Sequence, residues 1–295
     1  MNPFGGSGFF VSVFSFLITF YIRIFAQFVN GRIMTKRRGI IAARSGRSDM
    51  SFSGRIPFAV ALSFLAGAPT QAADVTIQSG PARVHLLELF TSEGCSSCPP
   101  AERWFATLRA SPRLWKDFVP VAFHVDYWDG LGWKDRLASA ANTARQRTYA
   151  SAWGSSTVYT PGFVLDGREW RGRDIGAIPT SAGNVGILSV RVREGGEIAV
   201  AFQPAANGAI HWQADVALLK SGLATDVKAG ENTGRTLPHD FVVLAHESAA
   251  MSASGVEVRA TLKLPLPRDR ALSEVAVWIT EAGKTEPVQA AGGAL

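Results

Sequence analysis

The chain contains two cysteines, Cys95 and Cys98, and two serines separate them. They follow the mostly apolar run 84–90 and precede a segment, residues 99–109, whose apolar residues have helical spacing. A strand, a turn with two thiols and a helix, in this order, form the arrangement that thiol–disulfide exchange uses. A two-residue spacer brings the sulfurs within bonding distance, and the start of a helix favours a thiolate.

The excess of positive charge lies near the N-terminus. Residues 1–73 hold eight of the 30 Lys and Arg residues and one of the 24 acidic residues, so 22 basic and 23 acidic residues remain in the rest of the chain. A part of the chain this close to neutral lacks the basic surface of a nucleic-acid-binding protein. We therefore expect no nucleic-acid partner.

Residues 1–73 have the features of an export leader. Basic residues precede the apolar stretch 56–68, which is too short to span a bilayer. Small residues suited to cleavage end at Ala72 and Ala73. The rest of the chain is therefore expected to be exported, in the simplest case to the periplasm, where an oxidising environment lets a cysteine pair form a disulfide.

An upstream run, residues 9–29, is long enough to span a membrane, although Arg23 interrupts it. It has two interpretations. Either it is a true membrane segment that anchors the protein, or the translation start lies further downstream, at Met34 or Met50. The second interpretation is favoured, because a spanning helix directly before a signal peptide would be unusual.

Residues 82–183 are expected to form a small α/β domain. The predicted order β–α–β–α–β–β–α corresponds to segments 84–90, 99–109, 119–126, 138–152, 158–167 and 168–171, and to a short helix capped by Asp174. The first two strands flank a helix and should be parallel. Pro99 and Pro100 fit only the first turn of a helix, so regular helix begins no earlier than Ser97 or Cys98.

Residues 184–295 are expected to form a β-rich, antiparallel, sandwich-like domain. Alternating apolar and polar residues between turn-forming residues predict strands at 185–192, 197–202, 214–219, 241–246, 256–263 and 274–280. The polar loop 230–239 is interpreted mainly as a solvent-facing turn. His211, His239 and His246 lack the spacing of a metal site.

Cys95 is the expected attacking thiol and Cys98 the resolving one. The first cysteine of such a pair is the more exposed and lies nearer the helix N-terminus. The alternative is a structural disulfide in an exported domain. A four-residue disulfide loop removes little entropy from the unfolded chain, which weakens this alternative. Neither interpretation requires a cofactor.

Two further residues are candidates for the catalytic site. Glu88 lies inside an otherwise apolar strand, and a carboxyl buried beneath the thiols could shuttle protons. The alternative is that Glu88 faces a polar surface or pairs with Arg83 or Lys134. Pro161 opens a later strand and could lie against the thiol turn through a cis bond, with Thr160 as a substrate contact, although most X-Pro bonds are trans.

The loop after the second predicted strand is the expected substrate-binding side. Tyr127, Trp128 and Trp133 could form a lip that holds a client, although packing between the two domains explains them equally well. His124 and Asp126 alternate with apolar neighbours and should point to one side of their strand. With the cysteines, His124 could complete a metal site, but a hydrogen-bonded core histidine explains it as well, so no metal is expected.

Several motifs together resemble a bacterial family catalogued as domain of unknown function 1223, whose members are exported and similar to thioredoxin. These motifs are residues 88–100, 124–135, 145–147, 158–161 and 230–237. The resemblance implies a thioredoxin-like fold for residues 82–183, with Pro161 in the place of the cis-proline that faces the active disulfide. The chain departs from the thioredoxin pattern at Gly94, where Trp is usual, and at Gly162, where a larger polar residue is expected.

The sequence as a whole predicts an exported thiol–disulfide oxidoreductase that acts on protein disulfides through Cys95 and Cys98. Its partners would be protein thiols and disulfides, and only an uncleaved leader would contact a membrane. Two other classes remain open. One is a non-catalytic binding module with a structural disulfide. The other is a copper or zinc carrier that uses the cysteines together with His124.

Overall fold

The structure is a computed structural model that describes residues 74–172, 174–180, 183–206 and 211–295. These residues all belong to one compact unit, residues 67–295. The expected leader, with its cleavage site, its apolar run and its alternative starts, lies outside the described residues. Among the residues that are described, no helix combines the length and the apolar composition needed to cross a membrane.

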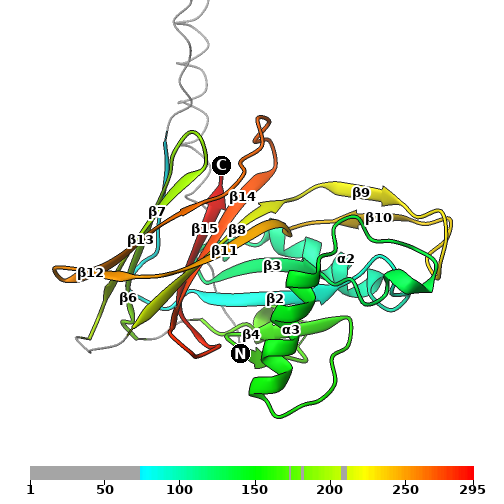
Figure 1. Cartoon of the computed structure of the whole chain (residues 1–295), viewed down its shortest axis with the longest axis horizontal. Helices are drawn as coiled ribbons and strands as arrows, with labels where there is room; N and C mark the ends of the chain where they lie inside the picture. Colours follow the sequence, from blue (N-terminus) through cyan, green and yellow to red (C-terminus); the bar gives the residue numbers. More distant parts are fainter. Residues whose placement is uncertain (1–73, 173, 181–182, 207–210) are drawn as a thin grey trace, which may run out of the picture. The chain divides into compact units, whose positions relative to one another are not determined.

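The segment that carries the thiols has the predicted order of strands and helices (Figure 1). It contains β2 (His85–Thr91), α2 (Pro99–Thr107), β3 (Phe118–His124), α3 (Ala140–Ala152), β4 (Gly162–Leu165) and β5 (Arg168–Glu169). As predicted, β2 and β3 are parallel, and β4 runs antiparallel to β2. Every residue of β2 and β3 is buried, which explains why both strands are almost continuously apolar in sequence.

Local signals set the ends of the helices. α2 begins at Pro99, directly after Cys98, which agrees with the limit predicted from the two leading prolines. α3 begins after Ser139, whose hydroxyl accepts a hydrogen bond from the Asn142 amide at 3.2 Å. The described chain also has the short 3-10 helices η1 (Leu108–Ala110), η2 (Asp129–Leu131) and η3 (Ile175–Ala177), and Asp174 caps the last of these as predicted.

Strands dominate the rest of the described chain. In addition to β1 (Val75–Gln78), they are β6 (Gly186–Val192), β7 (Glu197–Pro204), β8 (Trp212–Lys220), β9 (Leu223–Asp226), β10 (Thr236–His239), β11 (Val242–Ala250), β12 (Ser252–Ser254), β13 (Glu257–Lys263), β14 (Ser273–Glu281) and β15 (Pro287–Ala294). The structure is 14% helical and 45% strand. The α/β label is therefore partly wrong, because the protein is β-rich and its sheets are antiparallel or mixed.

One eight-stranded sheet contains strands from both halves of the described chain. Its order is β15-β14-β8-β11-β3-β2-β4-β5, and the halves meet where β11 pairs in parallel with β3, at Val242 and Ala122. A second sheet of five antiparallel strands has the order β1-β6-β7-β13-β12. The domain boundary expected between residues 183 and 184 stays a prediction, but it does not coincide with a break in the large sheet.

Two hydrophobic cores lie on opposite faces of the large sheet, and β14 contributes to both. Val275, Val277 and Ile279 belong to the core shared with the five-stranded sheet. Ala276 and Trp278, which alternate with them, belong to the core around β2, β3 and α2. Successive side chains of a strand point to opposite faces, so β14 is buried on both sides. The two halves therefore share packing as well as hydrogen bonds.

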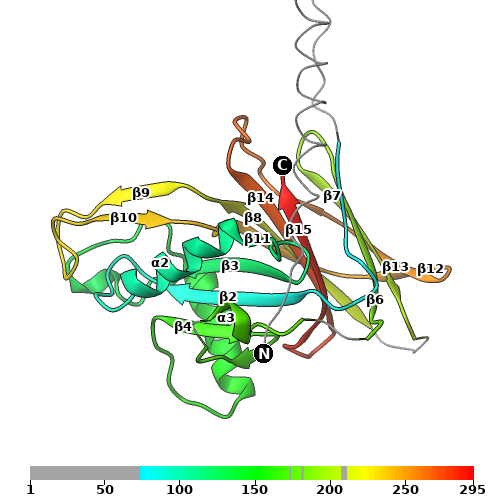
Figure 2. The same cartoon turned by 180° about the vertical axis from the view of Figure 1, so that it is seen from behind.

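The antiparallel hairpin β9–β10 forms a separate two-stranded sheet. It extends from the large sheet past α2, as both views show (Figures 1 and 2). β10 packs against α2. The sequence does not predict this hairpin, because its strands are only four residues long and the intervening loop is dense in polar residues. It brings a late part of the chain to the turn that holds the thiols.

Candidate redox site

The two thiols lie in the turn that joins β2 to α2. Cys98 directly precedes the first residue of α2, and its amide donates a hydrogen bond to the Cys95 carbonyl oxygen at 3.2 Å. Both residues are free thiols. Cys95 is 2% exposed and Cys98 is completely buried, whereas the spacer residues Ser96 and Ser97 are exposed. Cys95 is therefore slightly the more exposed of the two thiols, as expected, but both residues are buried in this structure.

The surroundings of the two sulfurs favour a thiolate at Cys95 and a thiol at Cys98. A hydrogen bond from Cys98 is the largest influence on Cys95, and together with the Ser97 hydroxyl, 3.2 Å away, it lowers the pKa of Cys95 to about 5 against the opposing effect of burial. Burial raises the pKa of Cys98 above its ordinary range, and the hydrogen bond to Cys95 acts in the same direction. The two thiols are therefore chemically unequal.

A loop from late in the chain covers the thiol turn. This loop, residues 227–235, joins β9 to β10, and we call it the thiol cover. Its Asn232 side chain is completely buried and donates hydrogen bonds to the carbonyl oxygens of Glu93, at 2.9 Å, and Cys95, at 3.0 Å. The thiol cover is therefore attached to the backbone on which the first thiol stands.

The thiol cover also contacts the spacer between the cysteines. The exposed Glu231 carboxylate accepts a hydrogen bond from the Ser96 amide at 3.2 Å. The interpretation of residues 230–239 as a mainly solvent-facing turn is wrong for Asn232 and His239, since both are buried. The hydrogen bonds of the cover to the thiol turn join residues 135 to 139 positions apart, so no local pattern in the sequence reveals them.

Thr160 and Pro161 lie against the thiol turn, as predicted. The peptide bond between them is cis. The Thr160 carbonyl oxygen lies 3.7 Å from the Cys95 sulfur and accepts a hydrogen bond from the Ser97 hydroxyl at 3.4 Å. The sequence therefore identified correctly which distant residues meet the cysteines at this side.

An open groove runs beside Pro161. Its lining residues are Ser97, Tyr159, Pro161, Phe163, Trp170 and Arg171. Gly162 has little room for a side chain, because an added Cβ would lie 3.0 Å from the Tyr159 carbonyl oxygen and 3.3 Å from the Gln146 amide nitrogen. This crowding explains why glycine stands where a larger polar residue was expected.

The predicted aromatic lip is tied to the site by hydrogen bonds. The Trp128 indole donates to the Thr160 hydroxyl at 2.8 Å, and the Trp133 indole donates to the Glu93 carboxylate at 2.7 Å. Tyr127 is half-buried, its hydroxyl donates to a side chain of α3 at 3.2 Å, and burial raises its pKa to about 12. Trp128 and Trp133 are therefore hydrogen-bonded to residues beside the cysteines, and Tyr127 is hydrogen-bonded to α3; the role of all three in substrate binding stays a prediction.

His124 and Asp126, predicted to act together, have different partners. The Asp126 carboxylate accepts a hydrogen bond from the Thr143 hydroxyl on α3 at 2.6 Å. His124 is buried, and its Nδ1 is hydrogen-bonded to the Asp135 carboxylate at 2.7 Å. The expectation of a shared orientation is therefore not supported by their contacts.

Glu88 is buried, but its contacts lie on α3. Its carboxylate pairs with the Arg145 guanidinium at 2.7 Å and accepts a hydrogen bond from the Tyr149 hydroxyl. Arg83 and Lys134, the partners considered from the sequence, are not the ones it takes. Neither of these hydrogen-bond partners is a cysteine, so the proposed proton shuttle through Glu88 gains no support.

The carboxylate connected to the resolving cysteine, through the Thr91 hydroxyl, belongs to Glu102, which was not among the residues expected from the sequence. Glu102 is buried on α2 and accepts a hydrogen bond from the Thr91 hydroxyl at 2.5 Å. The same hydroxyl is hydrogen-bonded to the Cys98 thiol. Because Glu102 follows Cys98 by four residues at the start of a helix, this spacing is the signal that would have identified it.

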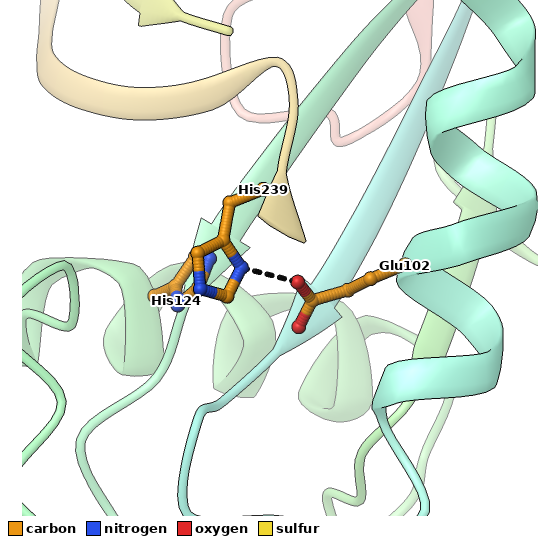
Figure 3. A group of neighbouring side chains, drawn as sticks. All are labelled: Glu102, His124 and His239. Atoms are coloured by element: carbon orange, nitrogen blue, oxygen red, sulfur yellow. Dashed lines mark hydrogen bonds and ion pairs between the residues drawn. The ribbon is translucent and has the colours of Figure 1, made fainter. Parts of the chain in front are cut away.

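Glu102 also belongs to a buried group that we call the histidine–carboxylate cluster: Glu93, Glu102, His124, Asp135 and His239. Figure 3 shows three of its members, Glu102, His124 and His239. His239, at the end of β10, bonds to Glu102 through Nδ1, and its Nε2 lies 3.3 Å from the Glu93 carboxylate. Burial lowers the pKa of His239, but these two carboxylates outweigh burial and raise it to about 10. The His124 and His239 rings meet edge to face, with centroids 5.0 Å apart.

The fold and the site define a β-rich protein that encloses a free dithiol at the start of a helix. The chain belongs to the family described as Protein of unknown function (DUF1223), whose model matches residues 86–280. The matched region includes the thiol turn, Pro161 and the thiol cover. A comparison with curated proteins gives no match.

Two solved structures are similar to this chain. A crystal structure of a protein from Agrobacterium tumefaciens is 28% identical, covers 72% of this chain and 95% of that chain, and has a TM-score of 0.52. HBP35 of Porphyromonas gingivalis is 13% identical, covers 74% of this chain and 76% of that chain, and has a TM-score of 0.51. The second similarity concerns the fold alone.

Proposed function

We propose that this protein is an exported thiol–disulfide oxidoreductase that acts on protein disulfides, with a thioredoxin-like domain over residues 82–183. The parallel strands β2 and β3 joined through α2, with β4 antiparallel beside β2, support this assignment of the fold. The thiol turn at the start of α2, with Thr160 against it, supports the assignment of the site.

The observation that carries the proposal is the difference between the two thiols. The pKa of Cys95 lies well below that of a free thiol, whereas burial raises the pKa of Cys98. A thiolate is the nucleophile in disulfide exchange, and its neighbour must stay protonated until the second step. Cys95 also precedes a helix N-terminus, where the helix dipole stabilises negative charge.

The proposed reaction has two displacements. The Cys95 thiolate attacks one sulfur of a client disulfide, which forms a mixed disulfide and releases the other client sulfur as a thiolate that takes up a proton. Cys98 then loses its proton and attacks the Cys95 sulfur, which releases the second client sulfur as a thiol. The client gains two electrons and two protons, and the Cys95–Cys98 pair becomes a disulfide.

Burial of Cys95 requires the resting structure to open before a protein client can react. The groove beside Pro161 and the spacer residues Ser96 and Ser97 are open to a client in the closed structure. In this proposal the thiol cover is the part that moves, since it is attached to the thiol turn by the hydrogen bonds of Glu231 and Asn232. In this proposal the client binds the groove first and reaches the sulfur when the cover opens.

Trapping of the mixed disulfide tests the proposal. Cys98→Ser should accumulate disulfide-linked client proteins, because the resolving thiol is absent, whereas Cys95→Ser and the double serine variant should trap none. The wild-type protein should also catalyse the reduction of insulin disulfides by a small thiol. No adducts with Cys98→Ser, together with no insulin reduction, would reject the proposal.

A second candidate function is favoured by the burial of both sulfurs. A non-catalytic binding module would have little need for accessible thiols, and Cys95 and Cys98 are 2% and 0% exposed. In that case the groove beside Pro161 would bind the partner, and the double serine variant would retain the biological activity of the wild-type protein in a complementation assay. Loss of activity in that variant would exclude the binding module. The copper or zinc carrier based on cysteines gains no support, because the residues grouped with His124 in ligand geometry include no cysteine.

A further inference from the structure

We propose that the histidine–carboxylate cluster binds one divalent metal ion through Glu102, His124 and His239. One potential ligand atom from each of these side chains lies within 4.8 Å of the others, and all three residues are buried. Around a tetrahedral zinc ion the ligand atoms stand about 3.3–3.5 Å apart, since the bonds are about 2.0–2.1 Å long. Small side-chain movements would therefore bring the three ligands to bonding distance.

Unpaired atoms inside the cluster are the second observation. Within the described part of the chain, Glu93 Oε1, His124 Nε2 and His239 Nε2 are buried and have no hydrogen-bond partner. Buried polar atoms without partners are rare, because burial removes their hydrogen bonds to water. His239 Nε2 lies 3.3 Å from Glu93 Oε1, at ion-pair distance, so these two atoms partner one another, whereas His124 Nε2 has no such partner among the described residues. A cation beside His124 Nε2 would use the lone pair that has no hydrogen-bond partner.

The remaining polar atoms of the same side chains are held by neighbours. Asp135 binds His124 Nδ1 at 2.7 Å, and Glu102 binds His239 Nδ1. For His124, a proton on Nδ1 leaves Nε2 as a lone-pair donor, and the Asp135 carboxylate behind Nδ1 is the usual support of a metal-bound histidine. For His239 the supporting carboxylate is Glu93 at Nε2, which leaves Nδ1 as the ligand atom. The Thr91 hydroxyl bonds to Oε1 of Glu102 at 2.5 Å, and Oε2 bonds to His239 Nδ1, so the ion would replace the proton between Oε2 and Nδ1. The cluster therefore has both ligands and the groups that orient them.

Charge also favours a cation. Glu93, Glu102 and Asp135 bring three carboxylates into one buried cluster, and the two imidazoles beside them are its only basic side chains. A buried excess of negative charge is costly unless a positive charge compensates it. Two imidazoles and a carboxylate form a donor set suited to Zn²⁺ and to neighbouring first-row ions. The ion would join α2, β3 and β10, which are distant in sequence.

Metal titration of the reduced, metal-free protein tests this site. The wild-type protein should bind one Zn²⁺ per chain by calorimetry. Its Co²⁺ complex should show visible d–d absorption without the thiolate-to-metal charge-transfer band that cysteine ligands produce. The Cys95→Ser/Cys98→Ser variant should bind with the same stoichiometry and affinity, because neither sulfur belongs to the proposed ligand set.

Matched variants locate the ion. His124→Gln should abolish stoichiometric binding, and Asp135→Asn, which removes only the support behind His124, should weaken the affinity about 10- to 100-fold. His211→Gln is the control, because His211 is exposed and lies outside the cluster. If His124→Gln does not fold, the stoichiometry and the cobalt spectrum of the wild-type protein decide the question.

Two results would overturn the proposal. The first is no stoichiometric uptake of Zn²⁺ or Co²⁺ by the wild-type protein, which would identify the cluster as a protonated His239 held between Glu93 and Glu102. The second is uptake that persists in His124→Gln but disappears in the double serine variant, which would place the metal on the cysteines. Neither outcome depends on thiol–disulfide activity, so this test is independent of the proposed function.

Discussion

Replacement of Asn232 by alanine should open the thiol cover and speed the alkylation of Cys95. Asn232 is the buried residue of the cover that bonds to the thiol turn, through the carbonyl oxygens of Glu93 and Cys95. Its other contact, from Arg235, lies within the cover itself and can persist when the cover opens. The substitution therefore weakens the closed state relative to the open one.

The size of the effect follows from the two lost hydrogen bonds. Each contributes about 1–1.5 kcal/mol to the closed state, so the open state gains about 2–3 kcal/mol in relative stability. Since a tenfold change corresponds to about 1.4 kcal/mol, the open population should rise about 30- to 150-fold. Alkylation follows this population as long as the cover closes faster than the reagent reacts.

The assay is the rate of iodoacetamide addition to Cys95 in the reduced protein, followed by peptide mass spectrometry at constant pH. Thr236→Ala is the control, because the Thr236 hydroxyl bonds to Asp226 within the hairpin. We expect little change for this control. An Asn232→Ala protein that retains its circular dichroism spectrum and alkylates at the wild-type rate would refute the idea that the cover controls access to the thiol.

Three further predictions concern charge, stability and metal. Ionisation of Cys95, followed by the ultraviolet absorbance of the thiolate, should have its midpoint at about pH 5, with thiolate above and thiol below, because the hydrogen bond from Cys98 lowers the pKa. A midpoint at about 8.5, the value of a free thiol, would contradict this. Arg145→Met should reduce the free energy of unfolding in urea by about 3–5 kcal/mol, because it leaves Glu88 buried without its partner. The exposed ion pair between Arg193 and Glu197 is the control, and Arg193→Met should reduce the free energy of unfolding by less than about 1 kcal/mol. Equal reductions in the two variants would argue against a buried ion pair at Glu88. Removal of the metal with a chelator should accelerate the alkylation of Cys95, because the ion would connect β10, which is joined to the cover, to α2 and β3. An unchanged alkylation rate in a protein shown to have lost its metal would mean that the metal site does not control the opening of the cover.

Local patterns in the sequence predicted the elements that build the thiol turn. Buried strands on both sides of a helix appear as continuous apolar runs, and a βαβ connection makes such strands parallel. The two prolines after Cys98 limited the start of α2 correctly. Pro161 was placed against the thiols through the family resemblance and not through spacing, because nothing in its local sequence identifies its distant neighbours.

The parts that the sequence missed depend on contacts between distant segments. Glu88 looked like the buried carboxylate near the thiols, yet α3 supplies Arg145 to pair with it, and Glu102 takes the position near Cys98. The short strands of the hairpin β9–β10 carry a weak periodic signal. The contact of the polar loop between them with the thiol turn depends on the fold, which brings Asn232 to the Cys95 carbonyl oxygen.

The sheet that each later strand joins shows the same limit. Alternation correctly indicated many strands after residue 184, but alternation does not specify which sheet a strand joins. β14 has apolar residues at successive positions, from Val275 to Ile279, because both of its faces are covered. Such a continuous run indicates a strand buried on both faces, and the prediction of an alternating strand at 274–280 did not use this signal.

The reduction potential of the Cys95–Cys98 pair, measured by equilibration with glutathione redox buffers, tests the central claim most directly. A pair that exchanges electrons with client proteins should titrate between about −270 and −120 mV, the range of thiol–disulfide oxidoreductases. A value below about −300 mV, which is typical of structural disulfides, would contradict the account. So would a failure of the two thiols to form a disulfide at all.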